Sequence, residues 1–176
     1  MWNWFVKKMV AVGQSRDPDF VVGGVENPYL RRWFVIPRNR FFNIYLHQFL
    51  RDDDDRALHD HPWAWCSILL QGMYREHTAD GPVSLRIAPS LKFSGPRRAH
   101  RIELMSAFWA ENDFDLACDI HRERPADKAP CWTLFITGPR VRTWGFHCPK
   151  GWVPWQEFTN PEDGGATVGR GCGESE

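Results

Sequence analysis

Two different patterns of apolar residues divide the chain. Near the N-terminus, apolar side chains recur every three or four positions, at Trp2, Phe5, Val6, Met9 and Val10. This spacing predicts one short amphipathic helix. From about residue 32 onward, short runs rich in β-branched and aromatic residues recur between Gly, Pro and Asp residues. This second pattern is typical of strands joined by turns.

The second pattern predicts a series of strands with no sustained helix between them. The candidates are residues 33–36, 41–50, 63–71, 74–78, 83–88, 99–104, 132–137, 142–147 and 152–158. Such a series favours an all-β barrel or sandwich over alternating strands and helices. We expect an N-terminal helix and lead-in over residues 1–31, one barrel over residues 32–160, and a glycine-rich, disordered tail over residues 161–176.

Composition narrows the class of protein further. The 176 residues are enough for one domain, and 22 Lys and Arg balance 22 Asp and Glu. Because a neutral chain has no global field to hold a polyanion, we expect no nucleic-acid partner. Apolar stretches fall short of the roughly 20 residues that span a bilayer, so we expect no membrane insertion. The five cysteines form no CxxC pair, which predicts reduced thiols and a cytoplasmic location.

The segment around His59-Asp60-His61 carries the clearest chemical signal. Histidines two positions apart on a strand project to the same face, with Asp60 on the other face. Neutral imidazoles are common ligands of Zn, Fe, Ni and Cu, and one strand cannot surround a cation. His100, on a later candidate strand, is the natural third ligand.

The wider arrangement resembles the two sequence motifs of the cupin superfamily. In both, a His-x-His pair follows a loop, a glycine closes the next strand (here Gly72), and a lone histidine follows on a strand roughly 40 residues after the pair. The resemblance implies a double-stranded β-helix, a jelly-roll barrel, that holds one divalent transition metal such as Fe, Zn, Ni or Mn. Many cupins add a glutamate four or five residues after the pair, where this chain has Trp65 and Cys66.

A three-histidine centre without that glutamate is similar to the centre of thiol dioxygenases, the cysteine dioxygenase type of cupin. Those proteins hold iron with three histidines and carry a cysteine near the lost glutamate, as Cys66 lies here. They also place a tyrosine and a histidine on a late strand, whereas this chain has Phe135 and Thr137 in the matching stretch. The resemblance therefore extends to the fold and the three ligands, but not to the substrate or the oxidation.

Residues near the His-x-His pair have competing interpretations. Trp63 and Trp65 share the parity of the two histidines, so strict alternation points them inward. A bulge at Pro62 would instead bring Cys66 inward, as a neighbour of the site. We favour Trp63 as the pocket wall and leave the choice between Trp65 and Cys66 open.

Substrate-binding candidates come from other strands. Arg98 shares the parity of His100 and would neutralise a carboxylate or phosphate inside the barrel. His47 and Tyr45 share one face of their strand, so His47 is a candidate fourth ligand or substrate contact. The acidic run at residues 52–55 is interpreted as a solvated loop, with a second cation site as the alternative. Arg142 is interpreted as structural.

Three functions are compatible with these residues. The first is a metal-dependent enzyme, dioxygenase-like, acting on a small anionic molecule. The second is a non-catalytic module that binds a metal or a metabolite, and the third is metal-free sugar epimerase chemistry with His100 as the base. The third leaves the His59–His61 pair without a purpose. We also expect a homodimer, because open sheet edges invite pairing.

Overall fold

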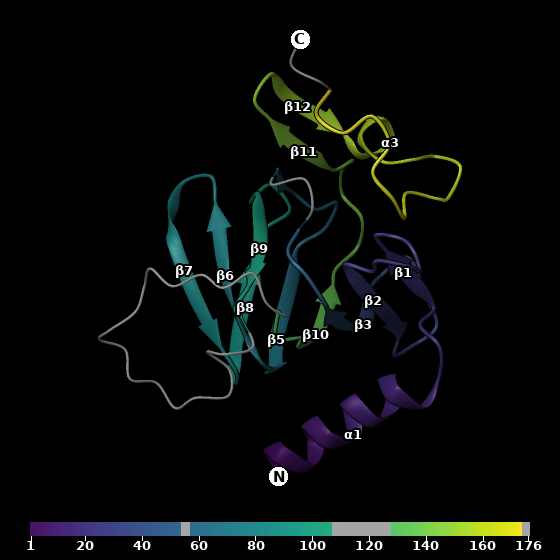
Figure 1. Ribbon diagram of the computed structural model, residues 1–176, viewed down its shortest axis with the longest axis vertical. Helices are drawn as coiled ribbons and strands as arrows, with labels where there is room; N and C mark the ends of the chain where they lie inside the picture. The colour runs from purple at the N-terminus through teal and green to yellow at the C-terminus, as the bar shows by residue number, and fades with distance from the viewer. Residues whose placement is uncertain (54–56, 107–127, 174–176) are drawn as a thin grey trace.

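Among the described residues, the protein contains two six-stranded antiparallel sheets, an N-terminal helix and a short helix near the C-terminus (Figure 1). The computed structural model describes residues 1–53, 57–106 and 128–173. In spatial order, the first sheet contains β1 (Phe20–Val22), β2 (Leu30–Phe34), β3 (Asn43–Phe49), β10 (Cys131–Thr137), β5 (Trp65–Gln71) and β8 (Ser90–Ser94). The second contains β12 (Gly151–Pro154), β11 (Gly145–Cys148), β4 (Leu58–His59), β9 (His100–Leu104), β6 (Met73–Thr78) and β7 (Gly81–Ile87).

The strand order is that of a jelly roll. Strands that are distant in sequence pair in space, so β10 lies between β3 and β5, and β9 lies between β4 and β6. The all-β, double-stranded β-helix predicted from the sequence is confirmed. Two strands, β1 and β8, were not among the predicted strands, and β1 has only three residues, too few to show an alternating pattern.

The N-terminal helix α1 (Trp2–Ser15) covers the outer face of the first sheet. Its apolar stripe packs against a cluster formed by Trp33, Leu46, Leu70 and Trp132. Gly13 is required at the contact, because a Cβ there would lie 2.6 Å from a ring carbon of Trp132. The predicted helix is therefore confirmed. No helix among the described residues is long and apolar enough to cross a membrane.

The space between the sheets has an apolar end and a polar end. At the apolar end, buried side chains from both sheets form one core, which contains Tyr29, Leu30, Phe49, Leu69, Tyr74, Ile102, Leu104 and Cys131. Burial raises the pKa of the Cys131 thiol to about 12, so this cysteine is a core residue and not a nucleophile. The polar end contains the histidines that the sequence singled out.

The C-terminal segment differs from the sequence-based expectation. Strand β12 leads into the short helix α3 (Trp155–Phe158), and the chain then follows a defined course to Gly173. The amide groups of Gly169 and Gly171 both donate to the Phe158 carbonyl, which fixes the tail that was expected to be disordered. Phe158 is fully buried against Phe146, with ring centroids 3.6 Å apart.

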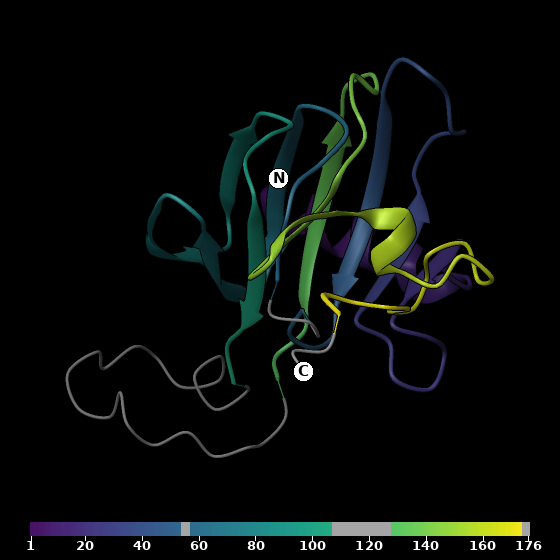
Figure 2. The ribbon, with the colours of Figure 1, turned by 90° about the horizontal axis from the view of Figure 1, so that it is seen from above.

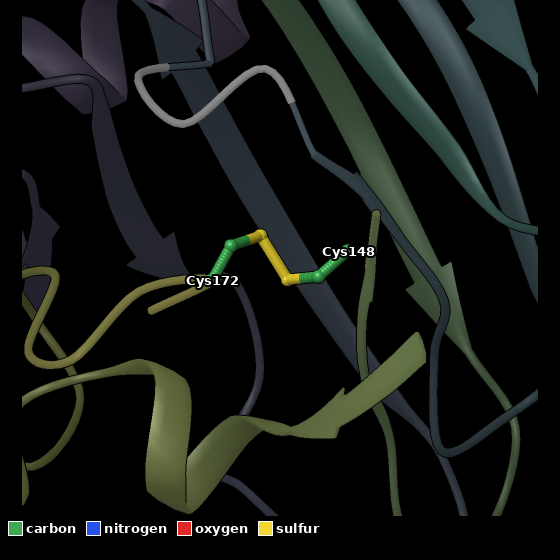
Figure 3. The surroundings of a disulfide bond; sticks show 2 residues. All are labelled: Cys148 and Cys172. Atoms are coloured by element: carbon green, nitrogen blue, oxygen red, sulfur yellow. A yellow bond between two sulfur atoms is a disulfide. The ribbon is translucent and has the colours of Figure 1, made fainter. Parts of the chain in front are cut away.

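A disulfide joins this segment to the second sheet. Cys148, at the end of β11, is bonded to Cys172 (Figure 3). The prediction of reduced thiols is therefore wrong for this pair, because the strand and the tail come together only in the folded chain. Cys66 and Cys131 are free.

Candidate metal centre

Three imidazoles converge at the polar end of the barrel. His59 on β4 is the direct cross-strand partner of His100 on β9, and His61 follows two residues after His59. One ring nitrogen from each of the three lies within 4.8 Å of the others. The Nε2 atoms of His61 and His100 are 2.9 Å apart. The structure thus brings together the three histidines that the sequence predicted to converge.

Carboxylates lie against the second ring nitrogen of two of these histidines. Nδ1–H of His100 donates to Glu76 at 2.8 Å, which leaves its Nε2 lone pair for a ligand role. Asp53 Oδ2 lies 3.2 Å from Nδ1 of His59. Metal-binding histidines commonly have such a carboxylate partner, which fixes the tautomer and the orientation of the ring.

Glu76 is the residue that sequence reasoning missed. It is almost fully buried on β6 and also accepts a hydrogen bond from Lys92 on β8. Burial alone would raise the pKa of Glu76, but hydrogen bonds from His100 and Lys92 outweigh it and lower this pKa to about 2. The signal was present in the sequence, since Glu76 shares the parity of the buried Tyr74.

The surroundings of His61 and His100 favour their neutral forms. Burial lowers the pKa of His61 well below its ordinary value, and the neighbouring His100 and His59 lower it further. Burial also lowers the pKa of His100, although the hydrogen bond to Glu76 opposes this effect. Neutral imidazole is the form that donates a lone pair to a metal.

Two aromatic rings form the wall beside the histidines. Trp65 stacks on His100, with ring centroids 5.1 Å apart, and Phe135 lies 5.2 Å from Trp65 and 5.8 Å from His61. Trp65, not Trp63, is therefore the ring against the cluster. Trp63 lies half-buried in the bend before β5, outside the alternation that pointed it inward.

Cys66 points to the opposite face of its strand from Trp65. Its cross-strand partners are Phe93 and Ile136, and its side chain is partly exposed. The choice left open by the sequence is thereby settled in favour of Trp65, because β5 begins at this residue and alternates regularly from there.

The other predicted substrate contacts separate into two groups. His47 and Tyr45 do lie inside the barrel on β3, stacked on each other, but His47 is not part of the three-histidine cluster and instead accepts a hydrogen bond from Arg32 at 2.9 Å. Arg98 is exposed in the connection between β8 and β9, so its placement on a strand facing the barrel is wrong. The alternation that placed it inward begins only at His100.

A buried carboxylate fixes the loop that carries the histidine pair. Asp60 accepts hydrogen bonds from the Gly145 amide at 2.9 Å and the Trp152 indole at 3.1 Å, and pairs with Arg142 at 2.9 Å. His147 lies 3.4 Å away. Asp60 therefore ties the pair to β11 and β12, and Arg142 has the structural role that was predicted. The acidic run at residues 52–55 lies partly outside the described residues.

No protein-family model matches the chain, and no curated protein matches its sequence. Solved structures resemble it at low identity. A double-stranded β-helix protein from Klebsiella pneumoniae is 12% identical, with a TM-score of 0.46 over 72% of this chain and 90% of that one. The DMSP lyase DddQ from Ruegeria pomeroyi is 11% identical, with a TM-score of 0.47 over 74% and 58%.

A cupin superfamily protein from Desulfitobacterium hafniense is 11% identical, with a TM-score of 0.41 over 62% of this chain and 77% of that one. At such scores the fold assignment rests on the strand order of the chain itself, described above. The cupin assignment predicted from the sequence agrees with that strand order and with the three-histidine cluster.

Proposed function

We propose that this protein is a metal-binding cupin in which His59, His61 and His100 hold one divalent transition metal ion, beside which a small anionic molecule binds. The observation that carries the proposal is the convergence of three ring nitrogens within 4.8 Å, two of the rings having a carboxylate at the other nitrogen. Imidazole ligands suit Zn, Fe, Ni or Cu better than Mg or Ca.

The donor set fits such an ion in charge as well as in type. Three neutral imidazoles leave the ion's two positive charges uncompensated by its ligands, and coordination positions stay open. An anionic molecule is the natural occupant of those positions. The nearby Glu76 is engaged by His100 and Lys92 and is therefore not available as a fourth ligand.

Arg32 supports the anionic character of the ligand. It lies on β2 with its Nε–H donating to His47, and its guanidinium lies 5.1 Å from the centre of the Tyr45 ring. Among the described residues, no Asp or Glu forms an ion pair with Arg32. Its positive charge acts on the histidine cluster, because it contributes to lowering the pKa of His61. A largely desolvated cation needs a counter-charge, and the ligand's carboxylate or phosphate would provide it.

Each group around the ligand would have a separate role. A bound metal would supply Lewis acidity, or dioxygen activation if the metal is iron. Arg32 would bind and orient the anionic group, as was expected of Arg98. Trp65 and Phe135 would restrict water on one side of the site. Glu76 holds the proton at Nδ1 of His100, so that Nε2 stays free to donate.

A non-catalytic binding module is the alternative, and one observation favours it. The carboxylates next to the described cluster, Asp53 and Glu76, both face histidines, so neither is free to act as a general base. Phe135, on the inner face where thiol dioxygenases have a polar side chain, cannot transfer a proton. Iron-loaded protein that consumes oxygen with a small thiol carboxylate would support the enzyme. Oxygen consumption that stays at the background level would support the module.

Metal analysis after purification without a histidine tag tests the proposal. The intact protein should retain about one equivalent of a transition metal, because three converging imidazoles bind such ions tightly. His59→Ala should lose it, whereas His77→Ala should not, since His77 pairs with Glu103 away from the cluster. If His77→Ala empties the site equally, or the intact protein binds no metal, the proposal is wrong.

A further inference from the structure

Four loops meet at the end of the first sheet that lies nearest the metal centre. They join β2 to β3, His59 to β5, β8 to β9 and β10 to β11, over residues 35–42, 60–64, 95–99 and 138–144. Backbone hydrogen bonds connect three of them, from Gly138 to Ala64 at 2.8 Å, from Val141 to Pro62 at 2.8 Å and from His61 to Pro96 at 3.1 Å. The β2–β3 loop lies beside them, because its last residue precedes Asn43, the cross-strand partner of Thr137. These loops therefore form one continuous surface.

This surface carries a row of exposed arginines, which we call the arginine rim: Arg38, Arg40, Arg97, Arg98 and Arg140. None of the five forms an ion pair with a described residue. The four loops contain one acidic residue, Asp60, which is buried and paired with Arg142. Exposed acidic residues lie outside these four loops. Asp19, for example, lies between α1 and β1 and is paired with Arg16. The rim is thus a concentrated positive surface.

The arginines follow the order of the strands. Arg38 and Arg40 precede β3, Arg140 follows β10, and Arg97 and Arg98 follow β8, in a sheet ordered β3-β10-β5-β8. Neighbouring strands lie about 4.8 Å apart, so the row extends over about 14 Å. A row of this length suits a chain of successive negative charges better than a single small ion.

Aromatic rings accompany the arginines. Phe41 is 63% exposed and Phe42 is 49% exposed, in the same loop as Arg38 and Arg40. The guanidinium of Arg40 lies over the Phe41 ring at 4.9 Å. Cationic side chains that follow a phosphate backbone, with exposed aromatic rings on which bases stack, are the features by which proteins bind single-stranded nucleic acid without reading its sequence.

We propose that the arginine rim binds single-stranded nucleic acid, with phosphates on the arginines and a base stacked on Phe41, the more exposed of the two rings. The expectation of no such partner rested on a net charge of zero, which averages over the whole surface. The fold instead gathers these arginines at one end, and local charge is what a phosphate backbone meets. This proposal goes beyond the metal-binding function and does not depend on it.

Fluorescence anisotropy of a labelled oligothymidylate with the full-length protein tests the proposal. Binding should weaken as salt rises from about 50 to about 200 mM, with a logarithmic slope of about −0.7 for each phosphate contacted, or about −3 for four contacts. The paired substitution Arg38→Gln and Arg40→Gln should weaken binding at least about tenfold and lower the slope. The matched control, Lys7→Gln with Lys8→Gln on α1, removes two equally exposed charges and should change neither.

Phe41→Ala distinguishes nucleic acid from other polyanions. It should weaken oligothymidylate binding about tenfold, by loss of stacking, and leave binding of heparin and polyglutamate unchanged. A thermal melt matching the intact protein would show that each variant is folded. No binding at about 50 mM salt, an equal loss in the lysine control, or a Phe41→Ala variant that binds oligothymidylate normally would each overturn the proposal.

Discussion

The buried polar groups near the histidine cluster differ between the two sides of the barrel. On the side of the second sheet, Glu76 faces His100, and Asp60, in the loop after β4, faces Arg142. On the first sheet, Arg32 has no described carboxylate, and the hydroxyls of Thr133 and Thr137 are buried without a hydrogen-bond partner among the described residues.

This difference divides the site into a completed half beside the second sheet and an incomplete half beside the first sheet, where some buried polar groups lack a partner in the described part of the chain. A buried donor or acceptor without a partner costs about 1–3 kcal/mol, so a fold keeps such groups where something else satisfies them. The second sheet would hold the metal by means of the protein's own residues. The first sheet would then provide the surface that a ligand completes.

The largest expected effect falls on the completed half. Asp60→Ala should lower the free energy of unfolding by about 3–5 kcal/mol. It would leave Arg142, the Gly145 amide and the Trp152 indole without the acceptor that they share. Chemical denaturation measures this change. Asp60→Asn, which keeps an acceptor, should lose less. If Asp60→Ala unfolds at the same denaturant concentration as the intact protein, the second sheet is not held together in this way.

Glu76→Gln should weaken metal binding about ten- to hundredfold, as is usual when the carboxylate behind a ligand histidine is lost. Competition with a chromophoric chelator measures the affinity. Glu103→Gln is the matched control, because Glu103 also faces a histidine, His77, but on the outer face. Equal effects of the two substitutions would contradict the special position of Glu76.

Arg32→Gln should not weaken metal binding, because it removes a positive charge near the centre, but it should weaken the binding of malonate to zinc-loaded protein. Loss of a charge-assisted hydrogen bond worth about 1.5–3 kcal/mol corresponds to about ten- to hundredfold in affinity. Calorimetry measures both steps. Arg98→Gln, which changes the exposed arginine, should have little effect. Should Arg98→Gln prove the damaging variant, the incomplete half of the site lies elsewhere.

The smallest effect is expected at Cys66. Cys66→Ser should change the free energy of unfolding by about 0.5 kcal/mol or less and should not alter metal affinity, since the side chain is partly exposed on the outer face. Thermal melts and the chelator assay together test this. A marked loss of metal would place the thiol at the site after all.

Local patterns were enough to predict the fold class and the three histidines. The short apolar runs separated by turn residues indicated the strands, and the cupin-like spacing indicated the three histidines, of which His59 and His100 lie opposite each other on β4 and β9 and His61 follows β4. Such features depend on local periodicity and motif spacing, which a sequence displays directly.

The other features of the site depend on the residue at which each strand begins and on contacts between segments that are distant in sequence, and a sequence shows neither directly. Trp63 and Arg98 were assigned inward-facing positions by counting in twos through residues that form no strand. Arg32, Glu76 and the Cys148–Cys172 pair acquire their roles from partners on other elements. The net charge of the chain likewise gave no sign of the arginine rim, because a total over all residues does not say where on the surface the charges lie.

X-ray absorption spectroscopy of zinc-loaded protein reports the ligands of the metal ion themselves. We expect three imidazole nitrogens at about 2.0–2.1 Å, with oxygen ligands in the remaining positions and no sulfur at about 2.3 Å. The same spectrum from His100→Ala protein should lose the three-imidazole pattern. A spectrum of the intact protein with fewer than three imidazoles, or with a sulfur ligand, would contradict the assignment of His59, His61 and His100 as the metal centre.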